Sequence, residues 1–179
     1  MLPNKRMIVR AALSVITLAC TAVAAFAEDT NTIRQYQFEP VSGKYELVMK
    51  EVPRPVAGNN EVLVRVRATS LNRRDLNMLR REYDERYSLA GSIPLSDGAG
   101  EVIAVGPGVT RFKVGDRVAG IFFEKWIDGA PSEESLETDR GGNAGGMLSE
   151  IVVTNEEGLV SIPDHLSYEE AATLPCAAV

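Results

Sequence analysis

The chain has 179 residues, of which 45% are hydrophobic and 25% charged, a composition typical of a soluble protein with one globular domain. Its formal net charge is −6, with 19 Lys and Arg against 25 Asp and Glu. Phosphate backbones are bound by clustered Lys and Arg, so this balance argues against a nucleic-acid partner.

The first 27 residues have the layout of a secretory signal peptide. A basic start (Lys5, Arg6 and Arg10) precedes an apolar run over residues 11–25, and residues 25–27 match a small-x-small cleavage pattern. The apolar run is short for a membrane anchor, which needs about 20 residues. We therefore expect cleavage after Ala27 and export to the periplasm or the exterior, with no stable membrane span afterwards. Anchoring or lipidation at Cys20 is the less favoured alternative, and a misread signal would leave the protein cytoplasmic.

Cleavage would change both the charge and the thiol content of the chain. It would remove three cations and no carboxylate, which takes the net charge from −6 to −9. Cys176 would then be the single cysteine, so no internal disulfide could form.

Beyond the signal, the sequence predicts short strands separated by Gly and Pro turns. The clearest is Glu61–Ser70, in which valines alternate with Arg65 and Arg67. The other expected strands cover residues 34–38, 45–52, 98–105, 117–123, 148–153 and 159–162. Many short strands with little helix predict a mainly β fold, a partly open barrel with a few short helices.

Two helices and one long loop complete the expected elements. A short helix is expected over residues 72–83, and residues 124–147 are polar and Gly-rich, which favours a long exposed loop. Ser167 and Glu170 form a capping box that opens a second helix, which Pro175 bends or ends. No predicted sheet remains for this last helix to pack against, so the end of the chain looks cut.

The glycine clusters do not predict a phosphate site. A dinucleotide fingerprint is Gly-x-Gly-x-x-Gly between a strand and a helix. The Gly98-Ala99-Gly100 cluster runs on into more strand, and the cluster at residues 141–146 has neither a clear strand before it nor a helix after it.

Four motifs in order carry a resemblance to a known family. They are VLVRVRATSLNRRD at residues 62–75, GAGEV at 98–102, GPGV at 106–109 and FKVGDRV at 112–118. This set resembles the GroES-like catalytic domain of alcohol dehydrogenases, in the medium-chain dehydrogenase/reductase superfamily. The resemblance implies a GroES-like catalytic domain over residues 28–165. It also implies that residues 166–179 begin the connection to a Rossmann cofactor domain, absent from this C-terminally truncated chain.

The resemblance also implies that no zinc is bound. Zinc members of the family have a Cys at the position of Asn72 and a His-Glu pair at Ser96-Asp97, so an amide and a hydroxyl replace two ligands here. Catalytic zinc needs three protein ligands from His, Cys or carboxylate. The structural-zinc lobe needs four cysteines, and residues 124–147 contain none. The one histidine, His165, is expected to be an exposed loop residue.

Without zinc, the resemblance narrows to the quinone oxidoreductase-like branch, which passes a hydride from NADPH or NADH to a quinone or an α,β-unsaturated carbonyl. Asn72 matches the branch's Asn, which lies near the nicotinamide and can donate a hydrogen bond to charge developing on the carbonyl oxygen. Asp75 completes an Asn-x-x-Asp pattern and is expected to fix the turn and the helix start. Asn72 is thus the candidate catalytic residue, and Asn72 and Asp75 are the candidate cofactor-binding residues. Asn and Asp at the start of a helix also commonly act only as caps, an alternative that applies to Asp75 more than to Asn72.

Three aromatic residues are candidates for the substrate side of the site. Phe123 and Trp126 are expected to line an apolar pocket for the small-molecule substrate, whereas core packing explains Phe122 equally well. Asp97 lies where zinc enzymes keep a carboxylate, and we expect a turn residue there rather than a base.

Two main hypotheses follow. The first is the catalytic-domain portion of a zinc-independent NAD(P)H oxidoreductase, with this chain inactive on its own. The alternative is a non-enzymatic secreted β-barrel remnant or binding module without a cofactor site, which export to a compartment poor in NADPH would favour. A zinc alcohol dehydrogenase is a third and weaker hypothesis, and the sequence leaves the oligomeric state open.

Overall fold

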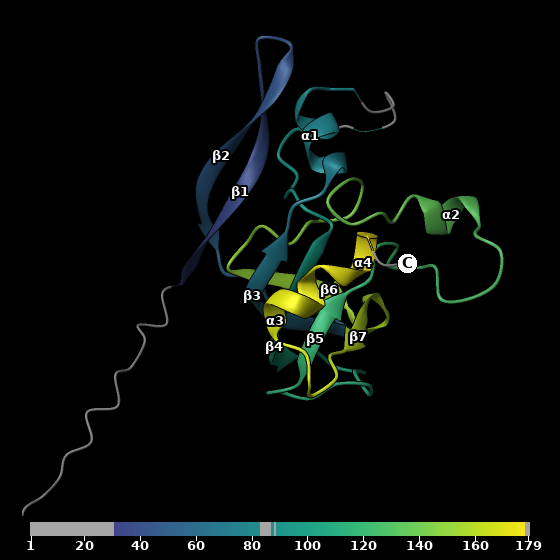
Figure 1. Ribbon diagram of the computed structural model, residues 1–179. Coiled ribbons are helices and arrows are strands. Elements are labelled where there is room, and N and C mark those ends of the chain that lie inside the picture. The colour runs from purple at the N-terminus through teal and green to yellow at the C-terminus, as the bar shows by residue number, and fades with distance from the viewer. Residues whose placement is uncertain (1–30, 83–86, 88, 178–179) are drawn as a thin grey trace, which may run out of the picture.

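The computed structural model describes residues 31–82, 87 and 89–177, which form two antiparallel sheets and several short helices (Figure 1). The predicted signal peptide and its cleavage site lie outside the described residues. Within the described part of the chain, no helix is long and apolar enough to cross a membrane.

The first sheet is a long hairpin of β1 (Thr32–Val41) and β2 (Lys44–Pro53), which extends away from the rest of the molecule (Figure 1). Its two-residue turn has positive φ at both Ser42 and Gly43, as a tight hairpin with right-handed strand twist requires. Both strands were expected from the sequence, and both are longer than predicted.

The second sheet has five strands in the order β6-β3-β4-β5-β7, and every neighbouring pair is antiparallel. The bounds are β3 Glu61–Ser70, β4 Asp97–Val105, β5 Arg117–Gly120, β6 Ile151–Asn155 and β7 Leu159–Ser161. The alternating valines of β3 supply one side of the core, where Val62 and Val64 pack with Val102 and Leu159. The sheets are open, so the mainly β, partly open architecture is confirmed.

Helix α1 (Arg73–Leu79) begins at the predicted place and ends earlier than predicted. The chain leaves the helix at Arg81, whose φ of 57° is left-handed and whose N–H bonds the Met78 carbonyl. Two strand predictions also differ at their ends, since β5 stops at Gly120 and β6 starts at Ile151.

The exposed loop expected over residues 124–147 is found only in the first part of that range. Residues 125–137 are exposed except for Ser135, whereas most of residues 138–147 are buried or half-buried. The short helix α2 (Glu133–Leu136) lies at the centre of the range, and the 3-10 turn η1 (Glu156–Gly158) follows β6. Asp139, Arg140 and Met147 are at most 1% exposed. The prediction failed for the second part because its charges are neutralised by partners distant in sequence.

The last described residues form two short helices, α3 (Tyr168–Ala172) and α4 (Leu174–Ala177). The predicted capping box is confirmed, since Ser167 accepts from the Glu170 N–H and Glu170 from the Ser167 N–H. The expectation that this helix had no sheet to pack against is wrong. Ala171 and Ala172 pack on Ala99 and Ala119 of the second sheet, where small side chains let the helix approach (Figure 1).

Candidate active site

Asn72 and Asp75 lie where β3 runs into α1. Asn72 is the N-cap residue of the helix, and its N–H donates to Asp75 Oδ2 at 2.7 Å, so Asp75 fixes the helix start as expected. Two side-chain atoms of this cap, Asn72 Nδ2 and Asp75 Oδ1, are buried and have no hydrogen-bond partner among the described residues. Burial raises the pKa of the Asp75 carboxyl, and the Asn72 N–H and the Arg74 charge oppose that rise. The cap thus presents one free donor and one free acceptor.

Asp97 lies close by as the first residue of β4, and it is fully buried. The prediction of a turn residue is therefore wrong. Its carboxylate can be buried because Ser96 Oγ donates to Oδ1 at 2.9 Å and the Cys176 N–H donates to Oδ2 at 3.3 Å. Burial and the negative charge of Asp97 raise the pKa of the Cys176 thiol. No role at this site was predicted for Cys176 from the sequence.

Arg74 links this polar cluster to the segment before Met147. It pairs with Asp139, and the two side chains are only 7% and 1% exposed. Its Nη1 also donates to the Arg140 carbonyl at 2.9 Å, and its guanidinium carbon lies 4.9 Å from the centre of the Phe122 ring. Burial raises the pKa of Asp139, while the charge of Arg74 lowers it.

Arg140 is a second buried cation that the sequence analysis missed. Its Nη2 lies 2.6 Å from Glu124 Oε1 and donates to Thr154 Oγ1 at 2.9 Å. Burial lowers the pKa of its guanidinium and the Glu124 charge opposes that change. The only sequence signal was a charged Asp-Arg pair directly before the glycines at 141–142. Arg140 ties the start of this Gly-rich stretch to β6.

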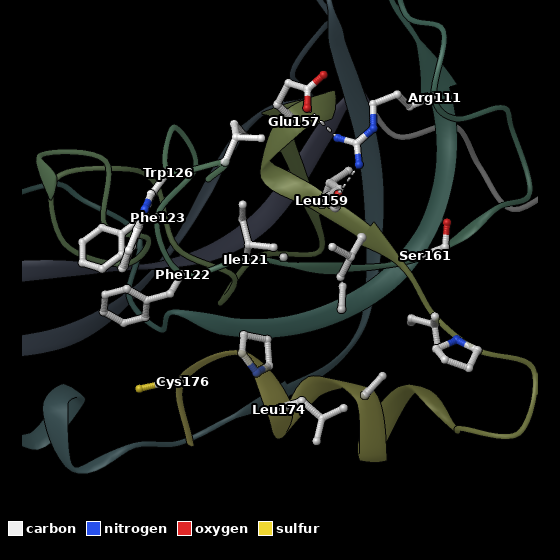
Figure 2. Close-up of a pocket in the computed structure, with 18 of the residues that line it drawn as sticks. Arg111, Ile121, Phe122, Phe123, Trp126, Glu157, Leu159, Ser161, Leu174 and Cys176 are labelled. Atoms are coloured by element: carbon white, nitrogen blue, oxygen red, sulfur yellow. Dashed lines mark hydrogen bonds and ion pairs between the residues drawn. The ribbon is translucent and has the colours of Figure 1, made fainter. Parts of the chain in front are cut away.

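An apolar pocket of about 880 Å³ has Phe122 in its lining (Figure 2). Phe122, Phe123 and Trp126 form one wall, with ring centres 4.7 Å apart for the first pair and 5.8 Å for the second. Leu174 and Cys176 come from the facing segment around α4 (Figure 2). Phe123 and Trp126 therefore lie at an apolar pocket large enough for a drug-sized ligand.

The four residues singled out from the sequence do not line one common pocket. Asn72 and Asp75 line a smaller pocket of about 290 Å³, together with apolar side chains of β2 and α1. Arg74 joins the two halves, since it follows Asn72 in α1 and packs on Phe122 at the larger pocket.

No metal centre is apparent in the residues that the structure describes, because no three His, Cys, Asp or Glu side chains gather as ligands there. His165 is exposed, as expected.

The alcohol dehydrogenase GroES-like domain family matches residues 58–164, which is more than half of the chain. The chain belongs to this family. The motifs that suggested it lie within the matched range, and the family assignment made from the sequence is confirmed.

Relatives of this GroES-like domain are dehydrogenases and reductases. A zinc-type alcohol dehydrogenase-like protein of Schizosaccharomyces pombe is 38% identical over 148 residues, covering 82% of this chain and 42% of the relative. A chloroplast envelope quinone oxidoreductase homolog of Arabidopsis thaliana is 34% identical over 131 residues, covering 71% and 33%. A solved structure of a protein named as an alcohol dehydrogenase from Sinorhizobium meliloti superposes with a TM-score of 0.74 at 38% identity, covering 82% and 43%. The chain thus spans about two fifths of the length of the first of these relatives.

Proposed function

We propose that this GroES-like domain is the catalytic portion of a zinc-independent NAD(P)H oxidoreductase that passes a hydride to an apolar quinone or α,β-unsaturated carbonyl. The observation that carries the proposal is the buried amide of Asn72, whose Nδ2 has no partner among the described residues. A buried donor left free in this way can stabilise negative charge on a substrate oxygen without a metal.

The donor set at the site does not fit zinc. Asn72 offers an amide, and the Ser96 hydroxyl donates to Asp97, whose two oxygens already accept hydrogen bonds. The name of the S. pombe relative, which includes zinc, describes that protein.

The fit to NAD(P)H is partial. Gly98 and Gly100 lie inside β4, where a Cβ would meet Met147 and the Arg65 carbonyl, so these glycines serve strand packing. We therefore assign the phosphates of the cofactor to the part of the relatives that this chain does not cover. NAD(P)H would supply the hydride, and Asn72 would donate a hydrogen bond at the nicotinamide end of the site.

The apolar pocket supports the substrate class. Most of its lining is aromatic and aliphatic, with Phe123 and Trp126 on one side and Leu174 on the other. Arg111, Glu157 and Ser161 are its charged and polar members (Figure 2). A flat quinone or an enone with an apolar substituent matches such a lining better than a polyol or a sugar does.

The test uses the native gene product purified from its source, with intact mass and metal content measured first. Intact mass shows whether residues 1–27 are removed, as the proposed export requires. Oxidation of NADPH and NADH is then followed with a panel of quinones and enones. Asn72→Ala is expected to lower kcat by about 10²–10³-fold, the usual loss on removing one such donor. Asn77→Ala, which changes a half-buried amide on the same helix, is the matched control. No turnover with any acceptor, or stoichiometric zinc whose removal abolishes activity, would refute the proposal.

A second candidate is an exported module that binds an apolar ligand without catalysis. It is favoured by the large pocket, which is formed by residues of this chain alone. Trp126 is the only tryptophan of the chain and lies at the pocket, so its fluorescence reports occupancy directly. Saturable quenching by a quinone, in a native product that does not oxidise NAD(P)H, would favour this function.

A further inference from the structure

The hairpin of β1 and β2 has one satisfied edge and one open edge. On the β1 side, Tyr36 N–H bonds the Leu148 carbonyl and Phe38 N–H bonds the Ser92 carbonyl. The Arg34 carbonyl accepts from Glu150 N–H on the same side. The even-numbered residues of β1 therefore point away from β2, toward the body of the molecule.

This alternation fixes which groups of β2 face outward. In an antiparallel pair, backbone groups of successive residues point to opposite edges of the strand. The odd-numbered residues of β1 must face β2, and the register pairs them with the even-numbered residues of β2. The N–H and C=O groups that point to the outer edge consequently belong to Tyr45, Leu47, Met49 and Glu51.

The backbone of the outer edge of β2 is unpaired in the part of the chain that the structure describes, although α1 packs beside its first half. Leu47 lines the smaller pocket together with side chains of α1, and Arg81 lies over the Tyr45 ring. None of the four outward-facing residues makes a backbone hydrogen bond outside the hairpin in the described part of the chain. Figure 1 shows β2 on the side of the hairpin that faces away from the sheet of β3–β7. Leu47 and Met49 are 37% and 56% exposed, so partly open apolar side chains lie beside the unpaired backbone on one face of the hairpin. Such an edge is a template for pairing with another strand.

The sequence of β2 is complementary to itself in one register. The β2 strands of two copies can form antiparallel hydrogen bonds only if residues whose backbone N–H and C=O groups point outward lie opposite each other. Centred on Val48, this places Leu47 opposite Met49 of the second copy, and Glu46 opposite Lys50, each twice by symmetry. A two-residue shift toward Leu47 would instead set Lys44 against Lys50, and a shift toward Met49 would leave Lys50 opposite Val48.

We propose that two copies of this chain associate through their β2 strands, centred on Val48, to form a continuous four-stranded sheet. Within one copy, Glu46 lies directly opposite Glu39 in the register, and Lys50 pairs with Glu39 at 3.1 Å. Like charges directly opposite are unfavourable. In its own hairpin, Glu46 has another carboxylate directly opposite. In the dimer, Lys50 of the second copy would lie opposite Glu46 and supply a cation.

Charge exchange tests this interface on the purified chain. Sedimentation equilibrium at low salt should show a concentration-dependent dimer. Glu46→Lys and Lys50→Glu should each raise the dimer Kd about tenfold or more, because symmetry puts each changed charge at two sites. An equimolar mixture of the two variants should associate again, since both contacts between positions 46 and 50 of the mixed dimer would then join opposite charges. Glu46→Lys also removes the repulsion by Glu39, so its effect cannot come from a weakened hairpin. Glu137→Lys, an exposed position on α2's C-cap, is the control for net charge.

Hydrogen exchange gives a second and independent readout. The amides of Leu47 and Met49 should exchange rapidly at low concentration and slowly in the dimer, whereas those of Glu46 and Val48 should be protected at both. A monomer at several hundred micromolar, or a dimer that neither single variant weakens, would overturn the proposal. Protection of Leu47 and Met49 in the monomer would also overturn it, because the edge would then be covered by the chain itself.

Discussion

Replacing Asp139 with Ala tests whether the buried ion pair with Arg74 holds α1 against the segment that precedes Met147. The Arg74 side chain is 7% exposed and the Asp139 side chain 1%, so water cannot replace the lost carboxylate. Removing one partner of a buried pair costs about 3–5 kcal/mol, because the other charge stays buried without compensation. Arg74 keeps its bond to the Arg140 carbonyl, which places our expectation near the middle of that range, at about 4 kcal/mol.

Urea unfolding followed by Trp126 fluorescence measures this loss. With a slope of about 2 kcal/mol per molar urea, the midpoint should fall by about 2 M. The double variant Arg74→Met/Asp139→Ala removes both charges and should be more stable than Asp139→Ala alone. Glu134→Ala breaks the exposed pair with Lys125 and should leave the midpoint in place. The reasoning fails if Asp139→Ala behaves like Glu134→Ala, or if the double variant is the least stable of the set.

Three further substitutions, the last of them a control, probe the helix cap and the packing of β4. Asp75→Asn keeps an acceptor for the helix cap but removes a carboxyl whose pKa is raised by burial. A raised pKa means that the folded state binds the proton more tightly than the unfolded state, so ionisation destabilises the fold as pH rises. The urea midpoint of the variant should therefore gain on that of the wild type as the pH rises above about 4, the ordinary carboxyl pKa. Gly100→Ala would place a Cβ 2.2 Å from the Arg65 carbonyl oxygen and should cost about 1–3 kcal/mol in urea unfolding. Gly115→Ala, with a φ of +93° but open space around it, should cost only about 1 kcal/mol.

The sequence was sufficient to predict elements whose structure depends only on neighbouring residues. The alternation of valines with Arg65 and Arg67 predicted β3 with both of its ends, because a strand buried on one face must alternate. The Ser167–Glu170 capping box was likewise predicted, because all of its hydrogen bonds form within one turn. These elements needed no information from the rest of the chain.

Prediction failed where burial depends on partners distant in sequence. Residues 124–147 are polar, and polarity alone indicates exposure. Arg140 is nevertheless buried because Glu124 and Thr154 satisfy its guanidinium, and no local pattern indicates that these residues meet. Asp97 is buried for the same reason, since one of its oxygens is bonded by the N–H of Cys176.

In the candidate site, individual residues could be predicted from the sequence, but their positions relative to one another could not. Asn72 and Phe122 lie at different pockets, yet Arg74 connects them, because it sits two residues after Asn72 and packs on the Phe122 ring. The pairing of Arg74 with Asp139 then fixes both against the segment before Met147. A donor amide and an aromatic wall that share one buried support cannot shift independently. This shared support would hold the Asn72 amide and the aromatic wall in one fixed relation, which is what the proposed function requires of a donor and the wall of a substrate pocket.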